Sequence, residues 1–353
     1  MQQADFFIHG FNDSDFLRLA KFCATTYPGK EISDAKYLDW EYQANADGNA
    51  IITVAENKSV LIAQYIVIPR NYSIGNALVS GSLSVNTLTH SGFRGNNLFP
   101  QLATETFKRC SELKINFTLG FPNPFSLPVI RKKKLFEIIG ELSLLIKPLT
   151  PFRSLFKYLS GKREKSGDEI ELNFTSINLK DAGISRLNFN EDKSIYDEFL
   201  SLFNRENQNV TFRSAEFLIW RYEQIPKRKY HLFKLIENGS MTGLAIIRAK
   251  YIYGLRCGIL IDFCLLKKSK MRPKFFKVLR EISKNNKLDI LLAAIPEHTV
   301  EYSCLQKNGY YKMPMNFLPQ KLSVIIRKHL PDCPPQVTDF SKWFLTFGDY
   351  DIF

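Results

Sequence analysis

The chain has 353 residues, a formal net charge of +13 and six cysteines. Its length exceeds what one hydrophobic core usually serves, so we expect two domains. An apolar fraction of 45% with a charged fraction of 24% is ordinary for a globular protein that folds alone. The positive charge indicates an acidic partner, and the phosphates of a nucleotide ligand, nucleic acid and an anionic membrane face are all compatible with it.

The cysteines show neither a CxxC pair nor the spacing of metal ligands, so we expect reduced thiols and no metal. Residues 1–7 lack the basic segment and apolar run that are typical of a secretory signal. No uninterrupted apolar stretch approaches the roughly 20 residues that a membrane-spanning helix requires. These features together predict a cytoplasmic protein.

Hydrophobic periodicity and turn residues predict the elements of the first half of the chain. The first helix carries Phe16, Leu19, Ala20 and Cys23 on one face. β-branched runs separated by turn residues then indicate an antiparallel meander. The expected order is a strand at 6–8, the helix around 16–23, the segment AKYLDWEY at 35–42, strands at 51–55, 60–69 and 78–89, a helix from 98 and a buried strand at 116–120.

The stretch VNTLTHSGFRGNNLF, residues 85–99, joins the third strand of the meander to a helix. Its turn is centred on Arg94 and Gly95. Amides in the first turn of a helix have no intrahelical partner, and the helix dipole favours negative charge there. A strand, a glycine turn and a helix start therefore form an anion pocket, although an ordinary strand-to-helix connection has the same local pattern.

An internal repeat divides the chain. The segment AKYLDWEY at 35–42 returns as AEFLIWRY at 215–222, which places Trp40 and Trp220 180 residues apart. After each copy come hairpin strands, a long strand, a basic turn, a helix and a further strand. We interpret the repeat as two domains of one fold, and we expect the two tryptophans to be core anchors rather than platforms for a nucleotide base.

The predicted boundaries are an N-terminal domain at 1–146, a basic linker at 147–167 and a C-terminal domain at 168–353. The linker is punctuated by prolines and contains a short amphipathic pattern flanked by lysines. We expect it to be a solvated linker that packs on its own domains. A peripheral membrane contact through residues 152–165 is the alternative.

Residues 91–99, SGFRGNNLF, resemble the central signature of the GNAT superfamily, the acyl-CoA-dependent N-acyltransferases. The signature is a basic or amide residue, two variable residues, glycine, a variable residue and then glycine or alanine, following a strand. The sequence departs from it at Asn97 and Phe99, where glycine and a small residue are usual. Asparagine reaches left-handed conformations more easily than most residues, and we expect Phe99 to point into the core.

The second signature of the superfamily is also present in part. Asn123 and Ser126 match its first half, whereas Ile130 replaces the tyrosine that usually protonates the departing thiolate. Lys134 and Leu135 replace its glycine-aromatic pair. A thiol has a pKa of about 8.5, so a thiolate can leave without that tyrosine if its charge is briefly stabilised.

In the second half of the chain the pattern is reversed. Residues 305–310 resemble the glycine-aromatic end of the second signature, while 267–276, KKSKMRPKFF, contain no glycine with which to hold a pyrophosphate. The resemblance implies an α+β (mixed α/β) fold with two GNAT-like domains, each a mixed, mostly antiparallel sheet flanked by helices. It also implies that the first domain holds acyl-CoA and that the second serves the acceptor or is scaffolding.

Tandem GNAT domains that close on a tail such as WFLTFGD, residues 343–349, are similar to bacterial nucleotide-sugar N-acyltransferases. The implied partners are acyl-CoA, with an acetyl or 3-hydroxybutyryl group, and an amino-deoxy sugar carried on dTDP or UDP, acylated for surface polysaccharide. No nucleic-acid partner is expected. Fem-like aminoacyltransferases of peptidoglycan and a non-catalytic GNAT-fold binding protein are the alternatives.

The resemblance also implies roles for particular residues. The family's oxyanion donors are backbone amides of the strand before the turn, here Leu88 or Thr89. The general base stays open among His90, Asp262, His9, Glu297 and His298, and water can carry the proton instead. The cofactor-binding residues implied are Arg94, Gly95, Asn96, Asn97 and Leu98 for the pyrophosphate, and Asn123 and Ser126 for the pantetheine or thioester end.

Overall fold

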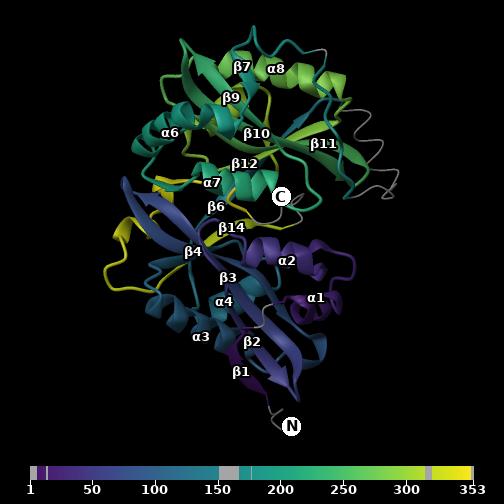
Figure 1. The fold of residues 1–353 in the computed structure, drawn as a ribbon, viewed down its shortest axis with the longest axis vertical. Helices are drawn as coiled ribbons and strands as arrows, with labels where there is room; N and C mark the ends of the chain where they lie inside the picture. Colours follow the sequence, from purple (N-terminus) through teal and green to yellow (C-terminus); the bar gives the residue numbers. More distant parts are fainter. Residues whose placement is uncertain (1–5, 13–14, 151–166, 176, 315–319, 351–353) are drawn as a thin grey trace. The chain divides into compact units, whose positions relative to one another are not determined.

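The computed structural model describes residues 6–12, 15–150, 167–175, 177–314 and 320–350 (Figure 1). The segment 152–165, for which the sequence left a membrane contact open, lies outside them. The chain forms two compact units. The first comprises Met1–Gly140, Glu216–Pro226 and Ser323–Phe340, and the second comprises Glu141–Ala215, Lys227–Leu322 and Ser341–Phe353.

The first unit is built on a mixed sheet in the order β1-β2-β3-β4-β5-β14. Neighbouring strands are antiparallel except β4 and β5, which are parallel, so the predicted meander and mixed sheet are confirmed. One strand is longer than predicted, because Pro69 and Asn71 stay in the ladder opposite Ser82 and Ser80. The strands are β1 (Phe7–Gly10), β2 (Ile51–Asn57), β3 (Val60–Ile74), β4 (Ala77–Thr89), β5 (Phe117–Gly120) and β14 (Leu322–Lys328).

Helices cover both faces of this sheet, as the side-chain alternation of β3 requires. Gln64 points to Cys23 of α1, and the next residue, Tyr65, contacts Phe107 of α3 on the opposite face (Figure 1). Phe99 packs partly buried against the same core as Tyr65, which is the direction expected for it. The helices are α1 (Leu17–Ala24), η1 (Glu31–Ser33), α2 (Ala35–Tyr42), η2 (Ser91–Phe93), α3 (Leu98–Glu112) and α4 (Ser126–Lys133).

The second unit repeats this arrangement with the sheet order β6-β12-β11-β10-β9-β7. Here β11 and β12 are the parallel pair, and the other neighbours are antiparallel. The strands are β6 (Glu137–Pro148), β7 (Ile184–Arg186), β8 (Asn209–Thr211), β9 (His231–Glu237), β10 (Ser240–Ile252), β11 (Leu255–Leu265), β12 (Ile290–Ile295), β13 (Tyr311–Lys312) and β15 (Trp343–Phe344). The α-helices are α6 (Phe189–Glu206), α8 (Arg272–Asn285) and α9 (Val300–Lys307), and short 3-10 turns are η5 (Pro335–Thr338), in the first unit, and η6 (Phe340–Lys342).

Each sheet takes its last strand from the other half of the chain. In the first unit β14, from the second half, pairs with β5, as Ile325 opposite Gly120 shows. In the second unit β6, from the first half, pairs with β12, as Ser143 opposite Ile295 shows. The second copy of the tryptophan segment, α7 (Ala215–Leu218) followed by a π-helical turn η3 (Ile219–Glu223), lies almost wholly in the first unit. The boundaries predicted from the sequence give each domain one continuous stretch of chain, and such stretches do not describe this exchange of strands.

The two tryptophans of the repeat pack against each other inside the first unit. Their rings stack with centroids 5.0 Å apart, and each indole Nε1–H donates a hydrogen bond of 2.9 Å to the backbone carbonyl of the other. Trp40 is 6% exposed and Trp220 is 2% exposed. The expectation that both are core anchors is confirmed, because neither ring has a free face for a nucleotide base.

We expect Trp220→Phe to lower the free energy of unfolding by about 2 kcal/mol, because the Trp40 carbonyl is left buried without its donor. Trp40→Phe should cost a similar amount, since the two hydrogen bonds are reciprocal. Urea denaturation measures the change, with Tyr27→Phe at a 41% exposed position as the control. A change below about 0.5 kcal/mol in both tryptophan variants would contradict the role as anchors.

Candidate functional site

The strands β4 and β5 separate at the end where α3 and α4 begin. Their parallel pairing covers Ser82 to Ser84 of β4 and Thr118 to Gly120 of β5. β5 ends there, whereas β4 continues to Thr89. Beyond Ser84, the edge of β4 that faces away from β3 therefore has no partner residue in β5.

A β-bulge at Asn86 accompanies this separation. The register between β3 and β4 shifts by one residue there, and Asn86 has a left-handed φ of 48°. Its amide nitrogen donates to Glu41 Oε2 at 2.6 Å and to the Tyr42 hydroxyl at 2.8 Å, and its carbonyl accepts from Gln64 Nε2 at 2.9 Å. Glu41 and Gln64 are each 1% exposed, so buried side chains fix the bulge. Sequence reasoning missed this network, although asparagine reaches left-handed angles more easily than most residues and could have indicated the bulge.

The direction of the backbone amides distinguishes the two predicted oxyanion donors. The N–H of His90 donates to the Ile62 carbonyl of β3 at 2.8 Å. Amide directions alternate along a strand, so the Leu88 N–H also points toward β3 and the Thr89 N–H points to the other edge. Of these two amides, only that of Thr89 therefore points away from β3, at the part of β4 that extends beyond the last residue of β5.

The turn after β4 has the backbone of an anion-binding turn. Gly95 has a φ of 88° and Asn97 a φ of 58°, so the left-handed conformation expected of Asn97 is present. A Cβ atom added to Gly95 would meet nothing within 4 Å, so glycine is required there by the backbone angle and not by a lack of space. The space beside the turn at Gly95 is open. The side-chain amide of Gln101 donates to the carbonyls of Asn96 and Asn97, which turns these carbonyls toward the helix.

The predicted pyrophosphate residues gather at this turn, at the N-terminus of α3. Arg94, Gly95, Asn96 and Asn97 are exposed, whereas the side chain of Leu98 is buried, so only its backbone amide can serve a ligand. Among the residues that the structure describes, none forms an ion pair with Arg94. The free first-turn amides, the helix dipole and the unpaired guanidinium together suit a phosphate group.

Asn123 and Ser126 lie at the corresponding turn after β5. Asn123 Oδ1 accepts hydrogen bonds of 2.9 Å from the amides of Phe125 and Ser126, and the Ser126 hydroxyl donates to the Asn123 carbonyl. Asn123 therefore caps the start of α4, a role that sequence reasoning did not foresee. Ile130 is 3% exposed and packs in the core, so it contributes no proton donor.

The histidines proposed as bases are engaged in hydrogen bonds. His90 Nδ1 accepts from the Gly92 amide at 3.2 Å, which places its proton on Nε2 and leaves no free lone pair on the ring. His9 contacts Glu56 and the Gly10 carbonyl. His298 Nε2 lies 2.9 Å from the Trp343 carbonyl and donates to it. The fourth candidate, Glu297, accepts hydrogen bonds from Lys312 and Ser143 that lower its pKa.

Asp262 lies in β11 of the second unit and is 1% exposed. Arg213 binds both of its oxygens, with Nη2 to Oδ1 at 2.9 Å and Nε to Oδ2 at 3.2 Å. The same guanidinium reaches Asp349 Oδ2 at 2.9 Å. A carboxylate held in this way acts as a structural counter-ion, and we assign it no part in proton transfer.

The loop of the second unit that corresponds to the turn has different chemistry. Residues 266–271 contain no left-handed residue. Glu206 accepts from the Lys267 amide at 2.7 Å, and Glu237 accepts from the Lys270 amide at 3.0 Å. The guanidinium of Arg272 binds three carbonyls of the same loop. The protein's own carboxylates thus occupy amides that a phosphate would need.

Comparison with known proteins agrees with this geometry. Residues 8–138 match the family described as acetyltransferase (GNAT) domain. The fold and the match together indicate a class for the first unit: residues 8–138 resemble an N-acyltransferase domain of the GNAT type. No curated protein matches the sequence significantly.

Solved structures share the fold over most of the chain at low sequence identity. A GCN5-related N-acetyltransferase from Anabaena variabilis ATCC 29413 has a TM-score of 0.61 at 10% identity, covering 92% of this chain and 73% of its own. A probable N-acyltransferase from Enterococcus faecalis V583 has a TM-score of 0.60 at 10% identity with the same coverage. The Saccharomyces cerevisiae N-myristoyltransferase with bound myristoyl-CoA has a TM-score of 0.58 at 13% identity, covering 92% of this chain and 79% of its own.

The described part of the chain contains neither a metal-binding cluster nor a membrane-spanning helix. Within the described ranges, no three His, Cys, Asp or Glu side chains come together as metal ligands would. No helix in the same part of the chain is both long enough and apolar enough to cross a membrane. Neither result bears on the turn at Arg94, whose chemistry depends on backbone amides and one guanidinium.

Proposed function

We propose that the first unit transfers an acyl group from acyl-CoA to an amine, with the pyrophosphate of acyl-CoA held at the turn after β4. The observation that carries the proposal is the contrast between the two copies of this turn. In the first unit Gly95 and Asn97 adopt left-handed angles, and the space beside the Gly95 Cα atom is open. In the second unit, Glu206 and Glu237 accept hydrogen bonds from the backbone amides of the equivalent loop.

The chain's own groups divide the work as follows. The amides of residues 95–98 and the Arg94 guanidinium bind phosphate oxygens. The Thr89 N–H donates a hydrogen bond to the thioester oxygen, where negative charge develops as the amine attacks. Acyl-CoA supplies the activated acyl group, and its sulfur leaves as a thiolate. Asn123 and Ser126 line the thioester end, and water removes the proton of the amine.

For the acceptor we propose an amino-deoxy sugar linked to dTDP or UDP, such as a dTDP-3-amino-3,6-dideoxyhexose, with an acetyl or 3-hydroxybutanoyl donor. Support comes from the two repeated units and from the tail at 343–349, which resemble enzymes of surface polysaccharide biosynthesis. The tryptophan segments do not contribute, because both indoles are buried. The myristoyl-CoA bound in the yeast neighbour supports the donor class and not the acceptor.

The test is a thermal-shift and calorimetric screen with CoA, acetyl-CoA, 3-hydroxybutyryl-CoA and several dTDP- and UDP-amino sugars. We expect CoA to stabilise the protein and one amino sugar to release thiol from an acyl-CoA. Arg94→Glu should weaken CoA binding about tenfold, because a charge-assisted hydrogen bond to phosphate becomes a repulsion. Asn97→Val should weaken it as well, since a β-branched residue is strained at a φ of 58°.

The matched control is Lys274→Glu, the same charge reversal at an exposed position in the first turn of α8. This variant should bind CoA as the unaltered protein does. Equal weakening by Arg94→Glu and Lys274→Glu would contradict the assignment of the donor to the turn at Arg94. The absence of stabilisation by every CoA species near about millimolar concentration would reject acyl transfer itself.

A further inference from the structure

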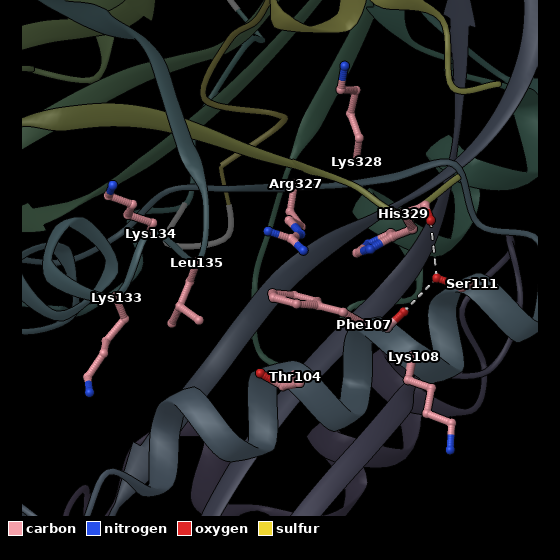
Figure 2. A pocket seen from close by; sticks show the side chains of 10 residues that line it. All are labelled: Thr104, Phe107, Lys108, Ser111, Lys133, Lys134, Leu135, Arg327, Lys328 and His329. Atoms are coloured by element: carbon pink, nitrogen blue, oxygen red, sulfur yellow. Dashed lines mark hydrogen bonds between the residues drawn. The ribbon is translucent and has the colours of Figure 1, made fainter. Parts of the chain in front are cut away.

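A basic cavity of about 400 Å³ lies in the first unit, at the end of the sheet opposite the turn. Its walls come from the C-terminal half of α3, the end of α4 and the end of β14 (Figure 2). Five cationic side chains line it, and no carboxylate of the described residues does. These cations are Lys108, Lys133, Lys134, Arg327 and Lys328.

A second hollow of about 350 Å³ shares Lys134, Arg327 and Lys328 with this cavity. Glu137 is the one acidic residue of the described chain that lines it. Each hollow falls in the range of about 300–1,000 Å³ that is typical of ligand pockets. The three shared cations thus line both hollows, with the Arg327 guanidinium between Lys134 and Lys328 (Figure 2).

The floor of the basic cavity has a defined geometry. The guanidinium of Arg327 lies over the Phe107 ring at 5.4 Å from its centroid, and the His329 ring lies 5.3 Å from the same ring (Figure 2). Burial, with Arg327 nearby, lowers the pKa of His329 to about 4, so its imidazole is neutral at physiological pH. His329 Nε2 lies 2.7 Å from Thr118 Oγ1, and Ser111 donates to the His329 carbonyl at 3.2 Å. Arg327 is thus held at the centre of the floor by packing rather than by an ion pair.

The charge of the cavity is uncompensated by the protein. Among the residues that the structure describes, none forms an ion pair with any of the five cations. Their mutual repulsion is a small cost in water, but their combined positive potential concentrates anions in the hollow. A ligand with several negative charges close together relieves the repulsion and gains a hydrogen bond to each cation that it reaches.

We infer that this cavity binds a compact soluble ligand that carries two or more adjacent phosphate groups. One phosphate has at most two charges, too few for five cations, and a flat membrane face would contact the rim rather than the buried floor at Phe107. The cavity is separate from the turn at Arg94, because Ser111 follows Leu98 along α3 by about 20 Å. The inference goes beyond the proposed function and does not depend on it.

The probe for this site is inorganic tripolyphosphate, measured by titration calorimetry with the full chain at an ionic strength of about 0.15 M. We expect the double variant Lys133→Gln with Lys134→Gln to weaken binding about tenfold or more, since two charge-assisted contacts are lost. The matched control is Arg131→Gln with Lys132→Gln, which removes the same charge at the end of α4 from residues that do not line the cavity. The control should change the Kd by less than about threefold. Arg327→Gln alone should also weaken binding.

Four outcomes would overturn the inference. Absence of tripolyphosphate binding would do so, as would equal weakening by the two double variants, which would indicate diffuse surface charge. Competition between tripolyphosphate and saturating CoA would show that the cavity belongs to the donor site, and the proposed function would then still stand. Binding of phosphatidylglycerol vesicles that depends on Lys133 and Lys134, without tripolyphosphate binding, would identify a membrane contact instead. Unchanged tripolyphosphate affinity in the presence of CoA supports the inference.

Discussion

Replacing Arg213 with methionine is expected to lower the free energy of unfolding of the second unit by about 3–5 kcal/mol, because Asp262 and Asp349 would lose their counter-charge in the interior. All three side chains are at most 2% exposed. The Arg213 guanidinium contacts one oxygen of each carboxylate at 2.9 Å. Removing one partner of such a group leaves buried charge that water cannot reach.

The pKa of Arg213 shows which effect dominates in this cluster. Burial acts to lower this pKa, but the charges of Asp262 and Asp349 outweigh it and raise the pKa well above its ordinary value. The guanidinium is therefore held in its charged form. Thr346 completes the cluster, since it hydrogen bonds to Asp262 and its amide donates to Asp349 Oδ2 at 2.8 Å. The segment at 343–349 is thus tied to β11 by this charge cluster.

Hydrogen exchange resolves the effect by unit. In Arg213→Met the amides of β11 should exchange faster, and those of β3 in the first unit should change little. The matched control is Arg205→Met, the same substitution at an exposed position of α6. Adding Asp262→Asn and Asp349→Asn to Arg213→Met should recover part of the loss, because the uncompensated charges are then removed. A loss below about 1 kcal/mol in Arg213→Met would contradict the argument.

The sequence predicted the local elements well because each depends on nearby residues. The turn is an example: Gly95 and Asn97 are residue types that reach positive φ, and both do. The repeat likewise predicted matching sheets, and the order of pairings in the two units is the same. Trp40 and Trp220 were expected in the core and are buried there.

The features that the sequence did not predict depend on contacts between distant segments. In a repeated sequence, nothing local shows which copy of a strand pairs with a given neighbour. β6 and β14 occupy equivalent positions in the two sheets, and either strand could form the same backbone hydrogen bonds with β12 or β5. The basic cavity is a similar case. Lys133 and Lys134 belong to a basic run in the sequence, and nothing local indicates that Arg327 lies beside them. The bulge at Asn86 depends on Glu41, a partner 45 residues away.

The second large effect concerns the amide of Thr89. If that N–H stabilises the developing negative charge, Thr89→Pro should lower kcat by about 100- to 1,000-fold, because proline has no N–H to donate. The substitution suits the local backbone. The Thr89 N–H faces away from β3, so the hydrogen bond of 2.8 Å from the His90 amide to the Ile62 carbonyl is retained. Leu88 is already extended, as a residue before proline prefers.

The experiment compares Thr89→Pro with Thr89→Ala, using the acyl-CoA and amino sugar that the ligand screen identifies. Thr89→Ala keeps the backbone amide and should retain kcat within about threefold. Both variants should bind CoA with unchanged affinity, since the turn at Arg94 is untouched, and CoA binding also shows that each is folded. A folded Thr89→Pro variant with the kcat of Thr89→Ala would rule out the Thr89 amide as the oxyanion donor. Loss of CoA affinity in Thr89→Pro alone would instead place this amide in donor binding.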